Sequence, residues 1–198
     1  MKLIILLCVM SLSLFGYNKA HLEKLFKEES CKQCDLSGVD LSNKDLSGFE
    51  IENSNFQGAN LSGANFFMAE LQNCDFSHAS LENGNFWKAN LQLSNFIKTK
   101  AKGANFKGAQ LQNSTIKNSD FSYSISWKAD FSDATIENND FSYSELGDAK
   151  FFNNNLTTNK LDNAILWKTI FKNTLITTKQ YEEAKKEEAI LVKIEILK

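Results

Sequence analysis

The sequence predicts an all-β solenoid whose coils have four sides, and three observations support this fold class. Every fifth residue from Leu36 to Ile176 is Leu, Phe or Ile at 27 of 29 positions, with Ala101 and Ser126 as the departures. No insertion interrupts the count. A period of five matches neither the turn of a helix nor the alternation of a strand, so neither element can continue through this stretch, and the unit must be a solenoid repeat.

Two positions in each five-residue unit are small or apolar, namely the central one and the one two residues before it. The earlier position is mostly Ala, Ser, Thr or Cys. Residues two apart point the same way along an extended chain, so both can face a common interior. If each unit makes one side and turns one corner, four units close a square coil of twenty residues.

A twenty-residue register sorts like residues into four columns, which we number by the side of the coil that they occupy. Stacking of aromatic rings between coils about 4.8 Å apart would favour placing like residues next to one another in a column. Residues 34–177 would then form about seven coils. The columns begin with Leu36, Phe56, Phe76 and Phe96; with Leu41, Leu61, Leu81 and Ala101; with Leu46, Phe66, Phe86 and Phe106; and with Ile51, Leu71, Leu91 and Leu111.

The repeat unit, seen in the segment ANLSGANF at residues 59–66, resembles the A(D/N)LXX pattern of the pentapeptide repeat family. The resemblance covers residues 34–178 and implies a right-handed quadrilateral β-helix with the central and preceding small side chains inside. A few large or polar residues stand at the small inward position, and we expect their coils to be the least regular. They are Lys44, Phe49, Asn139, Asn154 and Asn159.

Residues 1–20 are typical of a secretory signal peptide. Lys2 precedes an apolar run from Leu3 to Phe15, which is too short to span a bilayer comfortably, and small or polar residues follow. Cleavage could follow Gly16 or Ala20. We therefore expect an exported bacterial protein, periplasmic or secreted, with no stable membrane span after cleavage; a retained anchor or a buried apolar segment is the alternative.

Residues 21–33 are expected to cap the N-terminal end of the coil. Leu22, Leu25 and Phe26 would share one face of a short amphipathic helix there. An open solenoid end exposes unpaired backbone and apolar core, so a cover is needed.

Residues 178–198 are expected to cap the other end, and the family commonly closes its coil with a helix. Thr177 and Gln180 have the spacing of a capping box, so a helix should begin at this point. The last stretch, residues 190–198, suits a strand and a helix equally well.

Cys31 and Cys34 form a CKQC pair without a second pair for zinc or a following His for haem attachment. In an exported protein they could form a local disulfide. Alternatively, Cys34 is only the small inward residue of the first repeat, the role that Cys74 takes two coils later.

Catalytic constellations are absent from the sequence, since His21 and His78 have no partner that the register would bring close. We expect no enzyme activity, no metal and no cofactor. The Asp and Asn residues before each central residue should bind backbone or water at the corners. All 22 basic residues are Lys. Signal-peptide cleavage after Ala20 would remove Lys2 and Lys19, and the net charge of −2 would become two units more negative.

The outward positions after the column-three residues hold all three tryptophans of the chain. We call the resulting candidate binding surface the stripe; it consists of Phe67, Trp87, Lys88, Lys107, Trp127, Lys128, Trp167 and Lys168. We expect Lys107 between two indoles, and neighbouring indoles about 9.6 Å apart with a groove between them. A forty-residue duplication, suggested by the recurring WKA, WKA and WKT, is the competing explanation.

Two function classes remain open on the sequence alone. The first is an exported, non-catalytic scaffold or protein-interaction module that binds a protein or envelope component and no nucleic acid. The second comes from the resemblance: some cytoplasmic members mimic DNA and inhibit or protect topoisomerase (gyrase). A chain with 22 Lys and 24 acidic residues is a weak mimic of duplex charge density.

Overall fold

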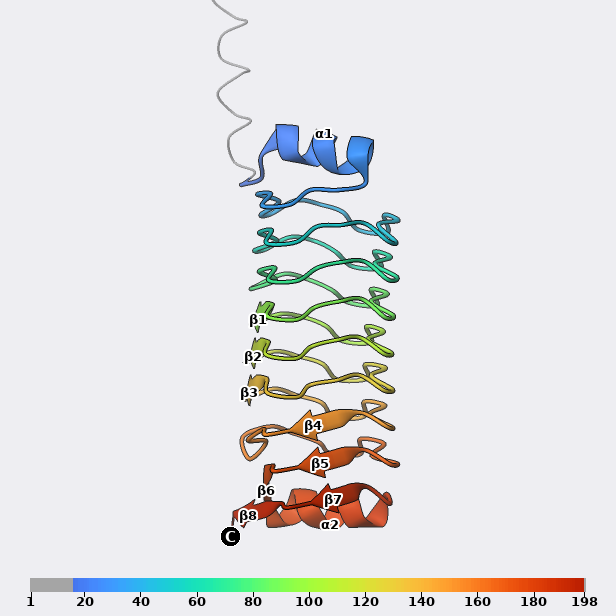
Figure 1. The fold of residues 1–198 in the computed structure, drawn as a ribbon, viewed down its shortest axis with the longest axis vertical. Helices are drawn as coiled ribbons and strands as arrows, with labels where there is room; N and C mark the ends of the chain where they lie inside the picture. The colour runs from blue at the N-terminus through green and yellow to red at the C-terminus, as the bar shows by residue number, and fades with distance from the viewer. Residues whose placement is uncertain (1–15, 198) are drawn as a thin grey trace, which may run out of the picture.

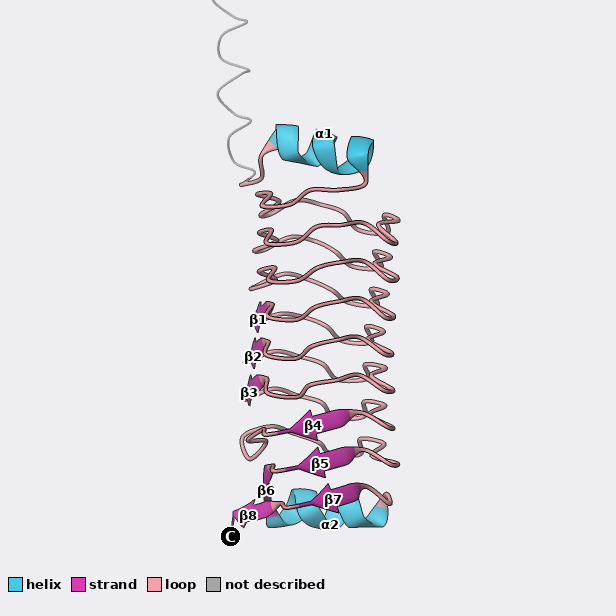
Figure 2. Cartoon of the chain, in the orientation of Figure 1, coloured by secondary structure: helices cyan, strands magenta, loops and turns pink. Residues whose placement is uncertain are grey.

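The chain folds into a straight four-sided β-solenoid with a helix over each end (Figure 1). The structure, a computed structural model, describes residues 16–197. Helix α1 (Lys19–Glu28) lies on the first coil and helix α2 (Thr178–Lys186) on the last (Figure 2). The predicted signal peptide lies mostly outside the described residues. Within residues 16–197, no helix has the length and apolar character to cross a membrane.

Consecutive coils pair in parallel at an offset of twenty residues, as the register predicts. One ladder of pairs runs from Ser30 through Glu50 to Ile190 without a break. Most coils pair through single residues, and eight short strands in the described residues are long enough to be named. They are β1 (Asn95–Ile97), β2 (Thr115–Lys117), β3 (Thr135–Glu137), β4 (Lys150–Phe152), β5 (Ile170–Lys172), β6 (Leu175–Thr177), β7 (Ile190–Val192) and β8 (Glu195–Leu197).

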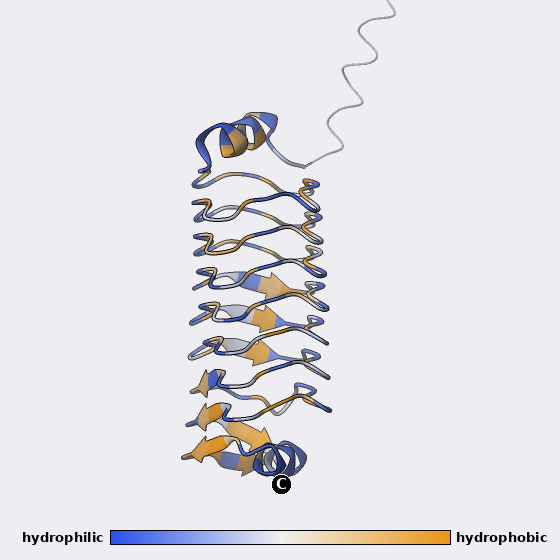
Figure 3. Ribbon diagram, turned by 90° about the vertical axis from the view of Figure 1, so that its right-hand side faces the viewer, coloured by the Kyte–Doolittle hydropathy of each residue, from blue (hydrophilic) through white to orange (hydrophobic). Residues whose placement is uncertain are grey.

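The core is a continuous column of side chains inside the coils. Every central residue from Leu36 to Ile176 is buried, which confirms the predicted register. Phenylalanine rings stack from coil to coil, as in the pairs Phe56 with Phe76 at 5.1 Å and Phe131 with Phe151 at 4.9 Å between ring centroids. Neighbouring stacks meet edge to face. Apolar segments therefore recur on every coil (Figure 3).

The corners explain the polar part of the repeat. The residue two after the central one usually has a left-handed backbone, with φ between 51° and 72°, which glycine and asparagine adopt most easily. The Asn or Asp before the central residue accepts the backbone N–H two residues on, as in Ser42 N–H to Asp40 at 2.9 Å. Hydrogen bonds from the Ser42 hydroxyl and N–H lower the pKa of Asp40. The predicted corner role of these residues is thus confirmed.

The register also predicts that the residue after each central one is exposed, and that the small side chain of Ser126 distorts its coil or lets Ile125 turn inwards. These two expectations, and that of a buried apolar face on the N-terminal helix, are wrong. The residues that follow the central ones are mostly half-buried, because neighbouring coils pack beside them, and Ser77, Ser122, Ser132 and Gly147 are buried. Phe26 is 45% exposed, and of the predicted helix face only Leu25 is fully buried. The coil at Ser126 is undistorted, since the Ser126 N–H still donates to the Glu145 carbonyl at 2.7 Å.

One coil is irregular, and it holds two of the large polar residues at the small inward position. Between β3 and residues 154–158 no backbone hydrogen bond is formed. Side-chain amides bond the backbone of β3 instead. Asn154 Nδ2 donates to the Ala134 carbonyl at 2.8 Å, and Asn159 Nδ2 donates to the Ile136 carbonyl at 2.9 Å. The first coil keeps its pairing because Lys44 is exposed rather than inside.

The C-terminal end combines a helix and two strands. The predicted capping box is present, with Thr177 and Gln180 bonded reciprocally. The buried Gln180 also donates to the carbonyls of Leu156 and Asn159 at 2.8 and 2.9 Å. Within the ambiguous last stretch, residues 190–192 and 195–197 form β7 and β8, which pair with β5 and β6.

Candidate binding surface

Side three of the solenoid carries the stripe, and its aromatic residues form two pairs. The rings of Phe67 and Trp87 lie 5.0 Å apart between centroids, tilted by 49°. Trp127 and Trp167 lie 5.9 Å apart, tilted by 51°. The outer two indoles, Trp87 and Trp167, are each 38% exposed, whereas Trp127 is half-buried. The stripe is therefore two separate aromatic pairs rather than an even row.

The expected groove between Trp127 and Trp167 is absent because the coil between them has Gly147. A Cβ at Gly147 would lie only 2.6 Å from the Trp127 ring, so the indole lies directly over this glycine and reaches Trp167. Trp127 Nε1 also donates to Glu145 Oε2 at 2.9 Å. Trp127 is thus held by its own chain, and part of its role is structural.

Three of the four lysines of the stripe lie against indole faces, although not as expected. Lys107 Nζ is 6.0 Å from the centroid of the Trp87 ring, and no such contact joins it to Trp127. Lys88 and Lys168 instead turn back over the tryptophans that precede them, at 5.6 and 4.1 Å. Such contacts contribute about 0.5 to 1 kcal/mol at exposed sites and place ammonium groups beside the rings.

Sequence reasoning missed the exposed aromatic and apolar residues that flank the stripe. Tyr123 and Tyr143 stack at 5.0 Å at the corner between sides two and three, and Lys102 Nζ is 5.2 Å from the Tyr123 ring. Ile165 is also exposed on side three, directly before column-three residue Leu166. The twenty-residue register that aligned the tryptophans also aligns the two tyrosines, so this signal was available in the sequence.

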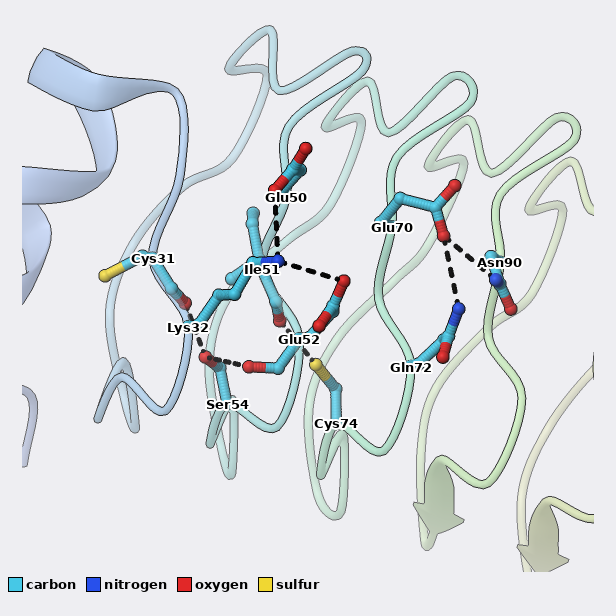
Figure 4. Close-up of polar contacts among 10 residues, drawn as sticks. All are labelled: Cys31, Lys32, Glu50, Ile51, Glu52, Ser54, Glu70, Gln72, Cys74 and Asn90. Carbon is cyan, nitrogen blue, oxygen red and sulfur yellow. Dashed lines mark hydrogen bonds and ion pairs between the residues drawn. The ribbon is translucent and has the colours of Figure 1, made fainter.

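Side four has a different, acidic character near the N-terminus (Figure 4). Lys32 Nζ lies between Glu50 and Glu52, at 3.1 and 3.3 Å, and Glu70 accepts hydrogen bonds from the amides of Gln72 and Asn90. Hydrogen bonds with Glu50 and Glu52, together with the negative charges of these two residues, raise the pKa of Lys32. The carboxylates of this side are therefore engaged within the protein.

The three cysteines that the structure describes have structural positions. Cys31 and Cys34 are joined by a disulfide, with 5.6 Å between their Cα atoms, and both are buried. Cys74 occupies a small inward position, as predicted, and its Sγ donates to the Ile51 carbonyl at 2.8 Å (Figure 4). Burial raises the pKa of Cys74 to about 12. In the described part of the chain, no three His, Cys, Asp or Glu residues gather as a metal site would require.

The irregular coil leaves a polar hollow of about 360 Å³ on side one. Its walls include β3, Asn153, Asn155 and Thr158. The Asn138 N–H donates across it to Thr158 Oγ1 at 3.0 Å. The hollow has no cluster of convergent acids, bases or nucleophiles.

Comparison with solved structures identifies the architecture. Two trypsin-treated variants of QnrB1, a plasmid-mediated fluoroquinolone resistance protein, align with TM-scores of 0.59 and 0.58 at 20% and 19% identity. The alignments cover 85% of this chain and 79% and 81% of those chains. HetL, a pentapeptide repeat protein from the cyanobacterium Nostoc sp. strain PCC 7120, is 20% identical over 90% of this chain and 92% of its own, with a TM-score of 0.37. No curated protein matches the sequence.

The family model for the pentapeptide repeat region matches the chain over residues 29–106 and 69–146. Together these matches span more than half of the sequence and coincide with the most regular coils. The parallel ladder, the four-sided coil and the QnrB1 alignment agree on a right-handed quadrilateral β-helix. The chain belongs to the pentapeptide repeat family.

Proposed function

We propose that this protein is an exported, non-catalytic scaffold that binds a protein or envelope component along side three. One observation carries the proposal: side three gathers all the tryptophans of the chain with four lysines of the stripe. Aromatic residues at an exposed surface are typical of binding hot spots, and exposed apolar patches usually mark contact surfaces.

Trp87 is the proposed centre of this surface. It is exposed, it contacts Phe67, and two lysines lie within 6.0 Å of its ring centroid. Trp127 is less suitable as a test position, because its loss would also uncover Gly147 and free Glu145.

The N-terminal sequence supports export, and the position of α1 bears on the site of cleavage. Asn18 caps this helix by accepting the Ala20 N–H at 2.9 Å, and the Asn18 N–H donates to the Asp35 carbonyl at 3.0 Å. Cleavage after Gly16 would keep both contacts, whereas cleavage after Ala20 would remove them. We therefore favour Gly16 as the last residue removed.

The experiment is capture from envelope extracts by the immobilised protein. Trp87→Ala should weaken capture by about 2 kcal/mol, or roughly thirtyfold, as for a central aromatic hot spot. Leu93→Ala, which truncates an exposed apolar residue on side four, should not. Equal capture by the wild type and Trp87→Ala would contradict the proposal.

Cell fractionation tests the export part separately. We expect the mature protein in the periplasm or the medium, with an N-terminus after Gly16. Full-length protein in the cytosol would contradict export and favour the topoisomerase alternative, which rests on the family resemblance and has no acidic face on side three to support it.

A further inference from the structure

We infer that the partner segment that docks on side three is an acidic stretch of polypeptide with apolar residues between its carboxylates. This inference rests on the proposed function and adds the chemistry of the partner. Three features of side three lead to it: the charge of the surface, the state of the aromatic rings and the exposed apolar side chain beside them.

The central part of side three carries charge of one sign, whereas Asp45 lies at its N-terminal end and Glu145 and Asp148 lie towards its C-terminal end. Among outward positions of side three between Asp45 and Glu145 there is no carboxylate, whereas Lys88, Lys107 and Lys128 all lie there. These three lysines form no ion pair within residues 16–197. Residues 83–119 as a whole contain six lysines and no Asp or Glu. Elsewhere the lysines are often paired, as Lys117 is with Glu137 at 3.1 Å.

Unpaired ammonium groups on a stretch of surface without carboxylates complement an anionic partner. Such complementarity contributes mainly to the rate and specificity of association. Acidic proteins, nucleic acids and acidic glycans all satisfy this requirement, so charge alone does not identify the partner.

The aromatic rings distinguish among these partners. Nucleobases and sugars bind by stacking on a free ring face. On side three each indole already has an aromatic neighbour, Phe67 for Trp87 and Trp127 for Trp167. Lysine ammonium groups lie over the Trp87 and Trp167 rings as well. Trp87 and Trp167 remain 38% exposed beside these ammonium groups, and such a surface suits carboxylate and aliphatic side chains better than flat rings.

An adjacent apolar residue adds to this preference. Met68 follows Phe67 at the corner and is 52% exposed, although methionine is usually buried. Its flexible thioether adapts to irregular apolar surfaces of a partner. An acidic polypeptide with interspersed aliphatic residues would engage Met68, the Trp87 edge and the lysines together.

The experiment measures binding of a fluorescein-labelled synthetic peptide in which Glu alternates with Leu and Ser, by fluorescence anisotropy at low and physiological salt. The comparison probes are a peptide with Lys in place of Glu, an oligothymidylate and an oligogalacturonate. We expect the acidic peptide alone to bind, and Lys88→Gln/Lys107→Gln to weaken its binding about tenfold. Circular dichroism verifies that the variant is folded.

The control variant is Lys172→Gln/Lys185→Gln. These lysines also lie over aromatic rings, Phe152 and Tyr181, but outside side three. An equal loss in both double variants would show non-specific attraction and overturn the inference. Tighter binding of the oligonucleotide or the glycan would overturn it in favour of those partners.

The failure of this inference can be told apart from failure of the proposed function. If the acidic peptide does not bind while Trp87→Ala still weakens capture from envelope extracts, side three binds a partner of other chemistry. If neither the peptide nor the extract responds to changes on side three, both the inference and the proposed function fail.

Discussion

At the scale of single residues, two buried serines differ in whether their hydroxyl groups find hydrogen-bond partners. Ser94 is fully satisfied: its Oγ accepts the Cys74 N–H at 3.0 Å and donates to the Leu71 carbonyl at 2.9 Å. Ser126 is equally buried, yet its Oγ has no hydrogen-bond partner in residues 16–197. The same residue type is thus stabilising at one inward position and unfavourable at another, because a buried hydroxyl needs a partner.

Ser126→Ala should therefore raise the free energy of unfolding by about 1 kcal/mol, since the substitution removes an unpaired buried hydroxyl. Ser94→Ala is the matched control and should lower it by about 1 kcal/mol or more, because the Cys74 N–H loses its acceptor. Urea denaturation of both variants measures the difference. A loss of stability in Ser126→Ala similar to that in Ser94→Ala would show that the hydroxyl is bonded.

At the scale of the coil, the corners tolerate side chains that the backbone does not favour. On side four the corner column reads Asn53, Asn73, Leu93 and Asn113, and Asn73 Nδ2 donates to Asn53 Oδ1 at 2.8 Å. Leu93 interrupts this column with a left-handed φ of 63° and an exposed side chain. Asparagine adopts this conformation more easily than leucine does.

Leu93→Asn should stabilise the fold by about 1 kcal/mol, through relief of backbone strain and an added rung in the amide ladder. Thermal unfolding should shift to a higher midpoint, whereas Leu93→Val, which is branched at Cβ, should shift it down. If Leu93→Asn melts at the wild-type temperature, the leucine is not strained, or its packing compensates.

The sequence predicts the coil, the register and the buried columns because a five-residue period without insertions leaves no other solution. It also points to the weak coil, through Asn154 and Asn159 at the small inward position. It does not predict how Trp127 lies over Gly147, since the register places side chains on a side without giving their rotamers. The pairing of indoles across a glycine depends on a contact forty residues apart, which only the folded coils create.

For the whole molecule, stability is approximately a sum of contacts between neighbouring coils, so a junction that lacks backbone pairs on one of its four sides is a weak point of the rod. That junction lies between β3 and residues 154–158, where side-chain amides replace backbone pairs and a hollow of about 360 Å³ opens. Below it, Gln180 of α2 connects the C-terminal cap to Leu156 and Asn159. The coils after the junction and α2 should therefore open together.

Native-state hydrogen exchange provides the measurement. The Ile136 N–H, which faces the junction, should exchange at least about a hundredfold faster than the Ile116 N–H, its equivalent one coil earlier within the β2–β3 pairing, because a local opening exposes it. Gln180→Leu removes the two hydrogen bonds to the carbonyls of Leu156 and Asn159, and should speed exchange throughout residues 154–177 while leaving residues 36–116 unchanged. Uniform acceleration along the whole chain would instead show that the solenoid opens as one cooperative unit and that the junction is not a boundary.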